Sequence, residues 1–412
     1  MADKTFAGPT LADFEDARER VVAVADVTPM ETARFLSDEL KSPVFLKCEN
    51  LQRTGSYKIR GAYNRLSRLT DEEKARGVVA ASAGNHAQGV AFAARELGIK
   101  ATIFMPVGVA LPKLQATKGY GADVVLRGHT VEEPLRAAAE FAENTGAVFI
   151  PPFDHWDVVA GQGTLGLEIL EQVPDVDTII IPIGGGGLIS GVSSAVRQKA
   201  ALLGRTIRII GVQAANAAPY PVSITNGYVT EVTTRPTIAD GINVAKPGEL
   251  NFAIIKDTVD EIIVVDDDLI AQAMLLLLER AKLVVEPAGA VGVAAILSEL
   301  VYDAGKTVVI LSGGNIDPLM MERVISHGLA ASERYLKLRI PLPDRPGQLA
   351  RTAAIVAEAN ANVVEVLHTR HTGGMQISEV ELELHIETRG PEHAEEVLNK
   401  LRDEGYEPRI DF

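Results

Sequence analysis

The sequence predicts an α/β fold of open parallel sheets, followed by a small α+β domain at the carboxyl end. From Val44 to Ile316, short runs that are apolar throughout alternate with longer helical stretches. Strands that are apolar on both faces belong to parallel sheets that helices cover on both sides. Near Ser332 the pattern changes to strands that alternate polar and apolar residues. With 412 residues, the chain is also too long for one ordinary domain.

The expected strands of the first part are continuous apolar runs, and helical stretches such as 86–98, 131–146 and 192–204 lie between them. This alternation predicts βαβ units and an open α/β sheet. The runs are GVVAAS (77–82), ATIFMP (101–106), ADVVLR (122–127), AVFIPP (147–152), TIIIPI (178–183), IRIIGV (207–212), EIIVV (261–265) and TVVILS (307–312).

The last part of the chain has the order βαββαβ, which is the ferredoxin-like layout. Its first strand, YLKLRIPLP (335–343), leads through the turn DRPG (344–347) into a helix over 349–360. The alternating segments 362–370 and 376–388 are expected to form a hairpin around HTGG (371–374). A proline opens the amphipathic helix 391–405, and EPRIDF (407–412) is the closing strand.

Composition and charge exclude several classes of function. The formal net charge is −15, and no basic run is present, so nucleic-acid binding is disfavoured. The single cysteine, Cys48, is expected to be a small core residue. The acidic amino terminus lacks the apolar segment of a signal peptide. The run AMLLLL (273–278) is far shorter than a membrane span, so we expect a buried helix in a cytoplasmic protein.

A tetraglycine segment, GGGGLISG (184–191), joins the strand TIIIPI to a helix. Backbone N–H groups at a helix start attract anions, and a phosphate fits such a site. Ile189 stands where a dinucleotide motif needs its third glycine, and no GK[ST] of a nucleotide-binding P-loop is present. The segment therefore predicts a phosphate site, with a plain glycine turn as the alternative.

Two further loops follow strands of the predicted sheet. SAGNHAQG (82–89) offers polar groups at a helix start and suits a carboxylate, and SGGN (312–315) follows TVVILS. Loops at the carboxyl ends of parallel strands should meet at one crevice. In TGSYKIRG (54–61), Lys58 lies in apolar surroundings. By itself this segment fits a solvated helix lysine better than a reactive amine.

Six motifs in order resemble the fold-type II pyridoxal-phosphate enzymes, and within them the threonine dehydratases, also called threonine ammonia-lyases. They are SYKIRGA, SAGNHAQG, GGGGL, TIADG (237–241), EPAGA (286–290) and SGGN. The resemblance covers roughly residues 10–330 and implies a two-lobed catalytic domain like the β subunit of tryptophan synthase. That domain would span 1–332, with the small lobe at about 55–155. Residues 335–412 resemble a regulatory ACT domain.

The resemblance implies that Lys58 carries pyridoxal 5'-phosphate as a Schiff base. An amine must be unprotonated to react, and we expect the apolar neighbours and the cationic Arg60 to lower the pKa of Lys58. The resemblance implies further cofactor contacts: Tyr57 would lie against the ring, Asn85 would donate to the ring hydroxyl, and Ser312 would be a neutral partner of the pyridine nitrogen. The phosphate would be held by the loop of Gly184, Gly185, Gly186, Gly187 and Leu188.

The resemblance also implies the substrate site. The carboxylate would meet the loop of Ser82, Ala83, Gly84 and His86, although His86 fits a structural histidine equally well. Ala239, Asp240 and Gly241 would line the pocket, with a simple turn as the alternative for Asp240. Glu286 would support the site indirectly, unless it only caps a helix.

The implied reaction is conversion of L-threonine to 2-oxobutanoate and ammonia, and of L-serine to pyruvate. A serine or D-amino-acid dehydratase and a serine racemase are alternatives within the fold, and a non-catalytic amino-acid sensor is an alternative of another class. Ala83 stands where racemases have a serine that donates a proton, so elimination is favoured. Related enzymes bind a metal through a glutamate where this chain has Gln213, so no metal is expected.

For the terminal domain, the resemblance implies an allosteric amino-acid site at an interface between two copies. Isoleucine and valine are candidate effectors, as expected in isoleucine biosynthesis, although a role in threonine breakdown is equally open. The implied contacts are Asp344, Pro346, Gly347 and Leu349. The alternative is a domain that only builds the homodimer or homotetramer.

Overall fold

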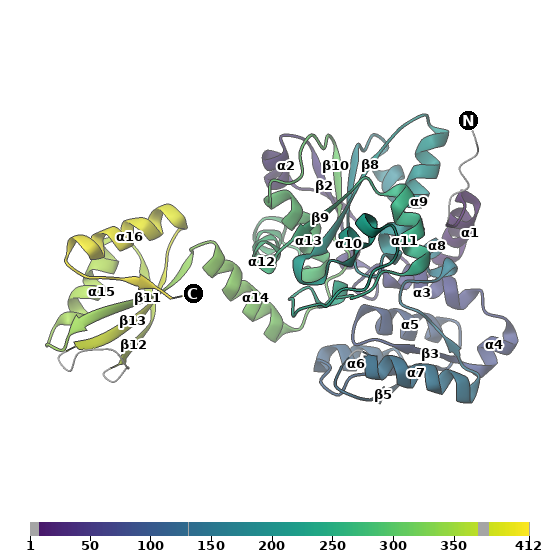
Figure 1. The fold of residues 1–412 in the computed structure, drawn as a ribbon, viewed down its shortest axis with the longest axis horizontal. Helices are drawn as coiled ribbons and strands as arrows, with labels where there is room; N and C mark the ends of the chain where they lie inside the picture. Colours follow the sequence, from purple (N-terminus) through teal and green to yellow (C-terminus); the bar gives the residue numbers. More distant parts are fainter. Residues whose placement is uncertain (1–7, 131, 370–378, 412) are drawn as a thin grey trace. The chain divides into compact units, whose positions relative to one another are not determined.

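The computed structural model describes residues 8–130, 132–369 and 379–411. By its internal contacts the chain divides into two compact units, Met1–Met320 and Met321–Phe412 (Figure 1). The division falls within helix α14 (Pro318–Ala331), whereas the sequence placed the boundary after the end of that helix.

The first unit contains a six-stranded sheet with the order β1-β2-β10-β7-β8-β9, in which only the pairing of β1 with β2 is antiparallel. The parallel strands are those expected from continuous apolar runs, together with β2. The short antiparallel strand β1 was not expected. The strands are β1 (Met30–Thr32), β2 (Val44–Lys47), β7 (Thr178–Pro182), β8 (Arg208–Ala214), β9 (Glu261–Val265) and β10 (Thr307–Ile310).

Helices cover both faces of this sheet. Ile179 and Ile181 pack with residues of α8 (Trp156–Gln172) and α9 (Gly187–Leu202), whereas Ile180 faces α13 (Pro287–Leu297). Successive side chains of a strand point to opposite faces, so an uninterrupted apolar run is what a sheet covered on both sides requires.

A smaller parallel sheet forms the other lobe of the first unit, with the order β5-β4-β3-β6. Val78 and Ala80 pack toward α5 (Asn85–Glu96), and Val79 packs on the opposite face toward α7 (Glu132–Thr145). Figure 1 shows these helices on the two sides of the sheet. The strands are β3 (Val78–Ala81), β4 (Ala101–Met105), β5 (Asp123–Leu126) and β6 (Val148–Phe149).

The strand β5 differs from the expectation, because it is not covered on both faces. It is the edge strand of the small sheet, and Val125 and Leu126 are 38% and 43% exposed. A continuous apolar run therefore does not distinguish a central parallel strand from an edge strand, since the difference lies in which neighbours the strand receives.

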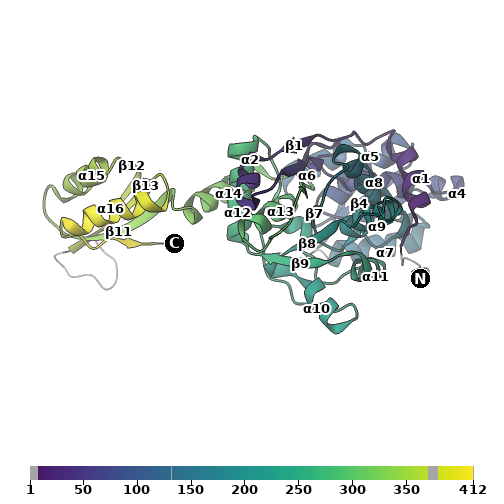
Figure 2. The ribbon, with the colours of Figure 1, turned by 90° about the horizontal axis from the view of Figure 1, so that it is seen from above.

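The remaining helices of the first unit connect the strands or lie over the sheets, and α10 projects from the body of this unit (Figure 2). The run AMLLLL falls in α12 and the single π-helical turn after it, Leu277–Ala281, and Cys48 is buried as expected. No helix in the described ranges is both long and apolar enough to cross a membrane. These helices are α1 (Leu11–Val21), α2 (Arg34–Leu40), α3 (Lys58–Ser67), α4 (Asp71–Arg76), α6 (Leu111–Gly119), α10 (Pro219–Asn226), α11 (Glu249–Thr258) and α12 (Asp267–Leu276).

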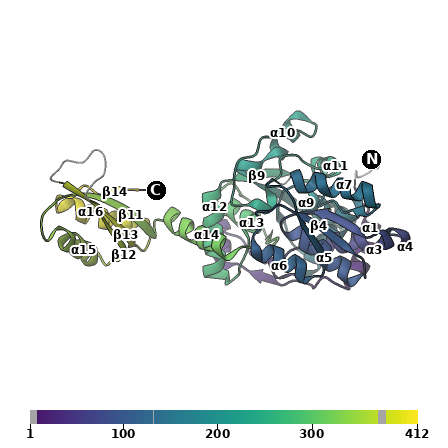
Figure 3. The ribbon, with the colours of Figure 1, turned by 90° about the horizontal axis from the view of Figure 1, so that it is seen from below.

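The second unit has the βαββαβ order that the sequence predicted. Its antiparallel sheet has the strand order β12-β13-β11-β14, which Figure 3 shows side by side. One face of the sheet is apolar and packs on two helices, and the predicted turn at 371–374 lies outside the described residues. The elements are β11 (Tyr335–Pro343), α15 (Gln348–Glu358), β12 (Asn362–Thr369), β13 (Glu379–Glu387), α16 (Pro391–Asp403) and β14 (Arg409–Ile410).

Candidate active site

Lys58 is the first residue of α3, and the segment before it is tied to the loop after β10. The backbone of Ser56 pairs with that of Gly313. The Tyr57 amide donates to the Ser312 carbonyl oxygen over 3.2 Å. These backbone contacts hold the start of α3 at the carboxyl end of the large sheet, where open α/β folds bind their ligands.

The side chain of Lys58 is partly buried rather than directed into bulk solvent. Its Nζ donates to the Pro152 carbonyl oxygen over 3.0 Å and lies 5.3 Å from the centre of the Tyr57 ring. Burial lowers the pKa of Lys58 to about 8, and the nearby Glu286 carboxylate opposes this shift. Desolvation disfavours the charged amine, so a substantial fraction of Lys58 is neutral near physiological pH.

Arg60 does not act on Lys58 in the way that the sequence suggested. It is almost fully buried and forms ion pairs with Glu49 at 2.8 Å and with Glu168 at 3.0 Å. Lys47 joins the same network through Glu168 at 2.5 Å. The positive charge of Arg60 is thus neutralised locally, and burial of the amine alone accounts for the low pKa of Lys58.

The tetraglycine segment forms the turn between β7 and α9, and α9 begins at Gly187. Gly186 has φ +103°, in the left-handed region that favours glycine. A Cβ at Gly185 would lie 2.3 Å from the ring of Phe153, and one at Gly187 would lie 2.9 Å from the Cβ of that residue. Glycine is therefore required here by close packing as well as by backbone conformation.

The carbonyl of Gly185 is held by three donors, namely the Tyr220 hydroxyl at 3.0 Å, the Asn251 amide at 3.2 Å and the Gly248 N–H at 3.2 Å. A trans peptide directs its C=O and the following N–H in opposite directions. The N–H of Gly186 therefore points away from these donors. Together with the unpaired first N–H groups of α9, it gives the loop the donor set that a phosphate requires.

Lys58 and the glycine loop meet at one dipeptide, Pro152–Phe153. The Lys58 amine contacts the carbonyl of Pro152, and the ring of Phe153 packs on Gly185. Asp154, the next residue, accepts the backbone N–H groups of Glu249 and Leu250 at the start of α11, each over 3.1 Å. The two features that the sequence singled out for a cofactor are thus parts of one site.

The SAGN loop ends β3 and starts α5, and Asn85 is the residue of this loop that is held most firmly. Its Nδ2 donates to Glu286 Oε1 over 2.6 Å, and its Oδ1 accepts from Asn315 Nδ2 over 2.8 Å. The Ser82 hydroxyl accepts the Gly84 N–H over 3.1 Å and shapes the turn.

Glu286 does not cap the helix that it precedes, because its carboxylate makes no capping hydrogen bond to α13. It is 5% exposed, and burial raises its pKa to about 7, with a further contribution from Asp240. Lys113, Asn85 and Lys58 oppose this rise. The group is therefore a buried carboxyl that titrates near neutrality close to the Lys58 amine, and perturbed groups of this kind cluster at functional sites.

The TIADG loop lies against the same carboxyl group. A Cβ at Gly241 would be 4.0 Å from Glu286 Oε1, and Ala239 is fully buried. Asp240 forms an ion pair of 2.8 Å with Lys113 of α6, which belongs to the small lobe. Asp240 therefore does more than shape a turn, since its ion pair joins the two lobes of the first unit.

Two residues that the sequence analysis discussed, His86 and Gln213, form hydrogen bonds to backbone groups. His86 is 5% exposed, and its Nε2 lies 2.9 Å from the Ile150 carbonyl oxygen. Burial and the nearby Lys58 lower the pKa of His86 to about 3, so the ring is neutral. Gln213 accepts the Tyr220 N–H over 3.0 Å.

Ser312 is 3% exposed and lies two residues after the end of β10 (Thr307–Ile310), whereas the sequence extended that strand to Ser312. The sequence assigned no role to Asn315, Lys113 or Phe153, although Asn315 ends the quoted motif SGGN. The sequence feature that could have identified Asn315 is an amide side chain in a glycine-rich loop after a strand. Nothing in the local sequence distinguishes Lys113 or Phe153.

In the second unit, the four residues expected at a regulatory site are exposed and lie around the turn between β11 and α15. Gly347 precedes α15 with φ +90°. The four residues are Asp344, Pro346, Gly347 and Leu349.

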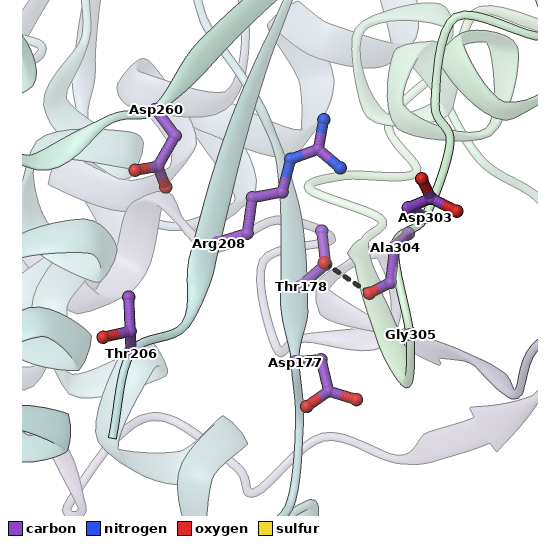
Figure 4. A pocket seen from close by; sticks show the side chains of 8 residues that line it. All are labelled: Asp177, Thr178, Thr206, Arg208, Asp260, Asp303, Ala304 and Gly305. Atoms are coloured by element: carbon purple, nitrogen blue, oxygen red, sulfur yellow. Dashed lines mark hydrogen bonds between the residues drawn. The ribbon is translucent and has the colours of Figure 1, made fainter. Parts of the chain in front are cut away.

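A surface pocket of about 500 Å³ lies at the opposite end of the large sheet from Lys58 (Figure 4). Arg208, which starts β8, donates to Glu261 and to the Tyr302 carbonyl, and the Thr178 hydroxyl donates to the Ala304 carbonyl. Because ligands of open α/β sheets bind at the carboxyl ends of the strands, this pocket is not the active site. It is lined by Asp177, Thr178, Thr206, Arg208, Asp260, Asp303, Ala304 and Gly305.

Comparison with protein families gives two matches. Residues 23–313 match the family described as pyridoxal-phosphate dependent enzyme, and residues 338–403 match the ACT domain.

Individual relatives are similar over most of the chain. It is 46% identical over 401 residues to an L-threonine ammonia-lyase of Thermotoga maritima, which covers 97% of this chain and 99% of that protein. The structure of processed threonine deaminase isoform 2 from Solanum lycopersicum has a TM-score of 0.72 and 36% identity, covering 78% of this chain and 95% of that one. The structure of maize serine racemase has a TM-score of 0.73 and 36% identity, and the match covers 79% of this chain and 99% of that one.

Proposed function

The chain belongs to the family of pyridoxal-phosphate dependent enzymes, and we propose that it converts L-threonine to 2-oxobutanoate and ammonia. The observation that carries the proposal is the partly buried amine of Lys58, whose pKa is lowered to about 8 and which meets the glycine loop at Pro152–Phe153. Relatives that act on threonine, at 46% and 36% identity, support the choice of substrate.

The residues present fit the cofactor. When bound, pyridoxal phosphate withdraws electrons from the α-carbon of an amino acid and makes its proton acidic. Lys58 would hold it covalently beside Tyr57, and Asn85 would donate to the ring oxygen. Ser312 would face the ring nitrogen without a formal charge. The phosphate would be bound by the loop of Gly184, Gly185, Gly186, Gly187 and Leu188.

Lys58 is also the base in this proposal. A neutral amine accepts a proton, and a pKa of about 8 leaves a useful fraction of Lys58 neutral at physiological pH. The substrate carboxylate would be bound by the loop of Ser82, Ala83 and Gly84 at the start of α5, where the helix dipole favours a negative charge. Ala239, Asp240 and Gly241 would form the wall beside Glu286.

A Lys58→Ala variant tests this assignment. We expect it to form no oxoacid from threonine above the rate without enzyme and to lose the cofactor absorbance that borohydride abolishes in the native protein. Lys100→Ala is the matched control, because the Lys100 side chain is exposed and forms a surface ion pair with Asp123 at 3.4 Å. Normal turnover by Lys58→Ala would end the proposal.

Serine racemisation is the second candidate, because maize serine racemase has nearly the same fold. Ala83 has no hydroxyl to donate a proton from the opposite face of the substrate, so we propose elimination, with L-serine as a second substrate that gives pyruvate. Pyruvate and D-serine are measured together after incubation with L-serine. We expect pyruvate to exceed D-serine, and the Ala83→Ser variant should raise the share of D-serine.

We further propose that the second unit binds an amino-acid effector, isoleucine or valine, through Asp344, Pro346, Gly347 and Leu349. The match to the ACT domain supports this idea. Threonine turnover is measured with and without each amino acid, in the full chain, in Leu349→Arg and in a truncation after Ser332. Inhibition that persists in the truncation would place the effector elsewhere. Inhibition of the full chain by isoleucine would favour a role in isoleucine biosynthesis.

We also propose a cytoplasmic homodimer or homotetramer. The edge strand β12 of the second unit exposes the apolar side chains of Val364, Val366 and Leu367, and an edge strand can pair with a second copy. Light scattering of the full chain and of Val366→Lys measures the assembly. If the full chain is a monomer at micromolar concentration, the proposed homodimer or homotetramer is excluded.

A further inference from the structure

Asn315 lies in a hydrogen-bond chain that the proposed reaction has not used. Its Nδ2 donates to the Thr54 carbonyl oxygen over 2.7 Å and to Asn85 Oδ1 over 2.8 Å. An amide nitrogen carries two hydrogens, so both are engaged. The chain continues from Asn85 Nδ2 to Glu286 Oε1 over 2.6 Å. It thus connects the segment before Lys58 with the SGGN, SAGN and EPAGA loops.

The direction of this chain is fixed at one end by the backbone. The Thr54 carbonyl can only accept, so the atom of Asn315 that faces it must be the nitrogen. That nitrogen also faces Asn85, whose oxygen must then point toward it. The nitrogen of Asn85 is thereby directed to Glu286. This hydrogen bond uses one of the two hydrogens on Asn85 Nδ2. The second hydrogen remains for another acceptor.

Glu286 alone would not fix the Asn85 amide at every pH. Its pKa is raised to about 7 by burial and by Asp240, with Lys113, Asn85 and Lys58 acting in the opposite direction. An ionised carboxylate accepts only, but a protonated carboxyl group can also donate to an oxygen. Asn315 has no such second state, because it does not titrate.

Two glycines show that the hydrogen-bonded side chains of Asn315, Asn85 and Glu286 are closely packed against backbone. A Cβ at Gly55 would lie 2.2 Å from Asn315 Oδ1, and that glycine has φ +72°. A Cβ at Gly313 would lie 2.2 Å from Glu286 Oε1 and 3.2 Å from Asn85 Nδ2. Backbone from two different loops therefore approaches these side chains so closely that a Cβ at either glycine would displace them.

We propose that Asn315 is a positioning residue that orients the amide of Asn85, so that its remaining N–H faces the ring oxygen of the cofactor. This inference rests on the proposed function, which gives Asn85 that oxygen as a partner. A hydrogen bond to this oxygen stabilises its anionic form, so the colour of the bound cofactor reports on the orientation.

Asn315→Asp is the sharpest test, because it keeps the shape and removes the donor. We expect pyridoxal phosphate to bind about tenfold more weakly, as for the loss of one good hydrogen bond. We also expect the absorbance at neutral pH to shift toward the form with a protonated ring oxygen. Asn315→Ala removes the donor without adding a charge and should shift both readouts in the same direction. It also serves if the aspartate variant does not fold.

Asn50→Asp is the matched control, because Asn50, in the short 3-10 helix Glu49–Leu51, is also a buried asparagine and donates to a backbone carbonyl, that of Val284, over 3.0 Å. It should lose stability without changing the absorbance. In an Asn85→Ala background, Asn315→Asp should add no further loss of cofactor affinity.

The outcomes separate this inference from the proposed function. If the native protein shows no absorbance that borohydride abolishes, the proposed function fails. If the native protein binds the cofactor, and a folded Asn315→Asp or Asn315→Ala variant keeps its affinity and its spectrum, the role of Asn315 is refuted and the proposed function stands. A full additional loss in the Asn85→Ala background would also refute it.

Discussion

The pKa of Lys58 predicts how fast the apoprotein captures pyridoxal phosphate at each pH. With a pKa of about 8, half of the Lys58 amines are neutral at pH 8. An ordinary lysine, with a pKa of 10.5, has only about 0.3% of its amines neutral at that pH, so Lys58 offers roughly 150 times more reactive amine. The neutral form increases as the pH rises, so the capture rate should increase toward pH 8 and level off above it.

The assay removes the cofactor, adds pyridoxal phosphate over a range of pH and follows covalent capture by absorbance, with borohydride to fix the product. Nα-acetyl-lysine, whose side-chain amine is free, gives the reference curve under the same conditions. Glu286→Gln supplies a second perturbation, because the Glu286 carboxylate favours the charged amine and raises the pKa of Lys58. Its removal should move the midpoint to lower pH.

Two results would refute this reasoning. A midpoint near that of free lysine would show that burial does not lower the pKa of Lys58. A midpoint that moves upward in Glu286→Gln would show that the carboxylate does not act on the amine as a nearby negative charge.

Three more predictions follow from single contacts. Arg60→Met removes the charge partner of two buried carboxylates and should lower the free energy of unfolding in urea by about 3–5 kcal/mol, whereas a loss below about 1 kcal/mol would contradict the buried network. Gly185→Ala places a Cβ 2.3 Å from the phenyl ring packed against the loop, and cofactor affinity measured by fluorescence titration should fall about tenfold or more. Lys113→Ala should raise the pKa of Glu286 and Asp240→Asn should lower it, because Lys113 stabilises the carboxylate and Asp240 repels it. The acidic limbs of the two pH–rate profiles should therefore move in opposite directions, and shifts of the same sign would exclude Glu286 as their origin.

Local patterns in the sequence determined most of the architecture. The apolar runs identified the parallel strands, because a strand covered on both faces needs apolar side chains at every position. The tetraglycine segment indicated a phosphate loop by itself, because it exposes backbone N–H groups at a helix start within one short segment. The lysine motif indicated a reactive amine only together with the five other motifs of the resemblance. The alternating pattern after Ser332 likewise predicted the order βαββαβ of the second unit.

Pairings between distant residues could be decided only by the tertiary structure. The sequence counted Arg60 as a free charge beside Lys58, yet Glu49 and Glu168 neutralise it. It gave Asn315 no role, because the partners of that side chain lie in two loops far away along the chain.

The sequence by itself thus determined which chemical groups are available, since composition and spacing are local properties. The tertiary structure decided which of them are neutral, paired or oriented. The pKa of a lysine and the direction of an amide depend on burial and on hydrogen-bond partners, and folding supplies both from remote parts of the chain.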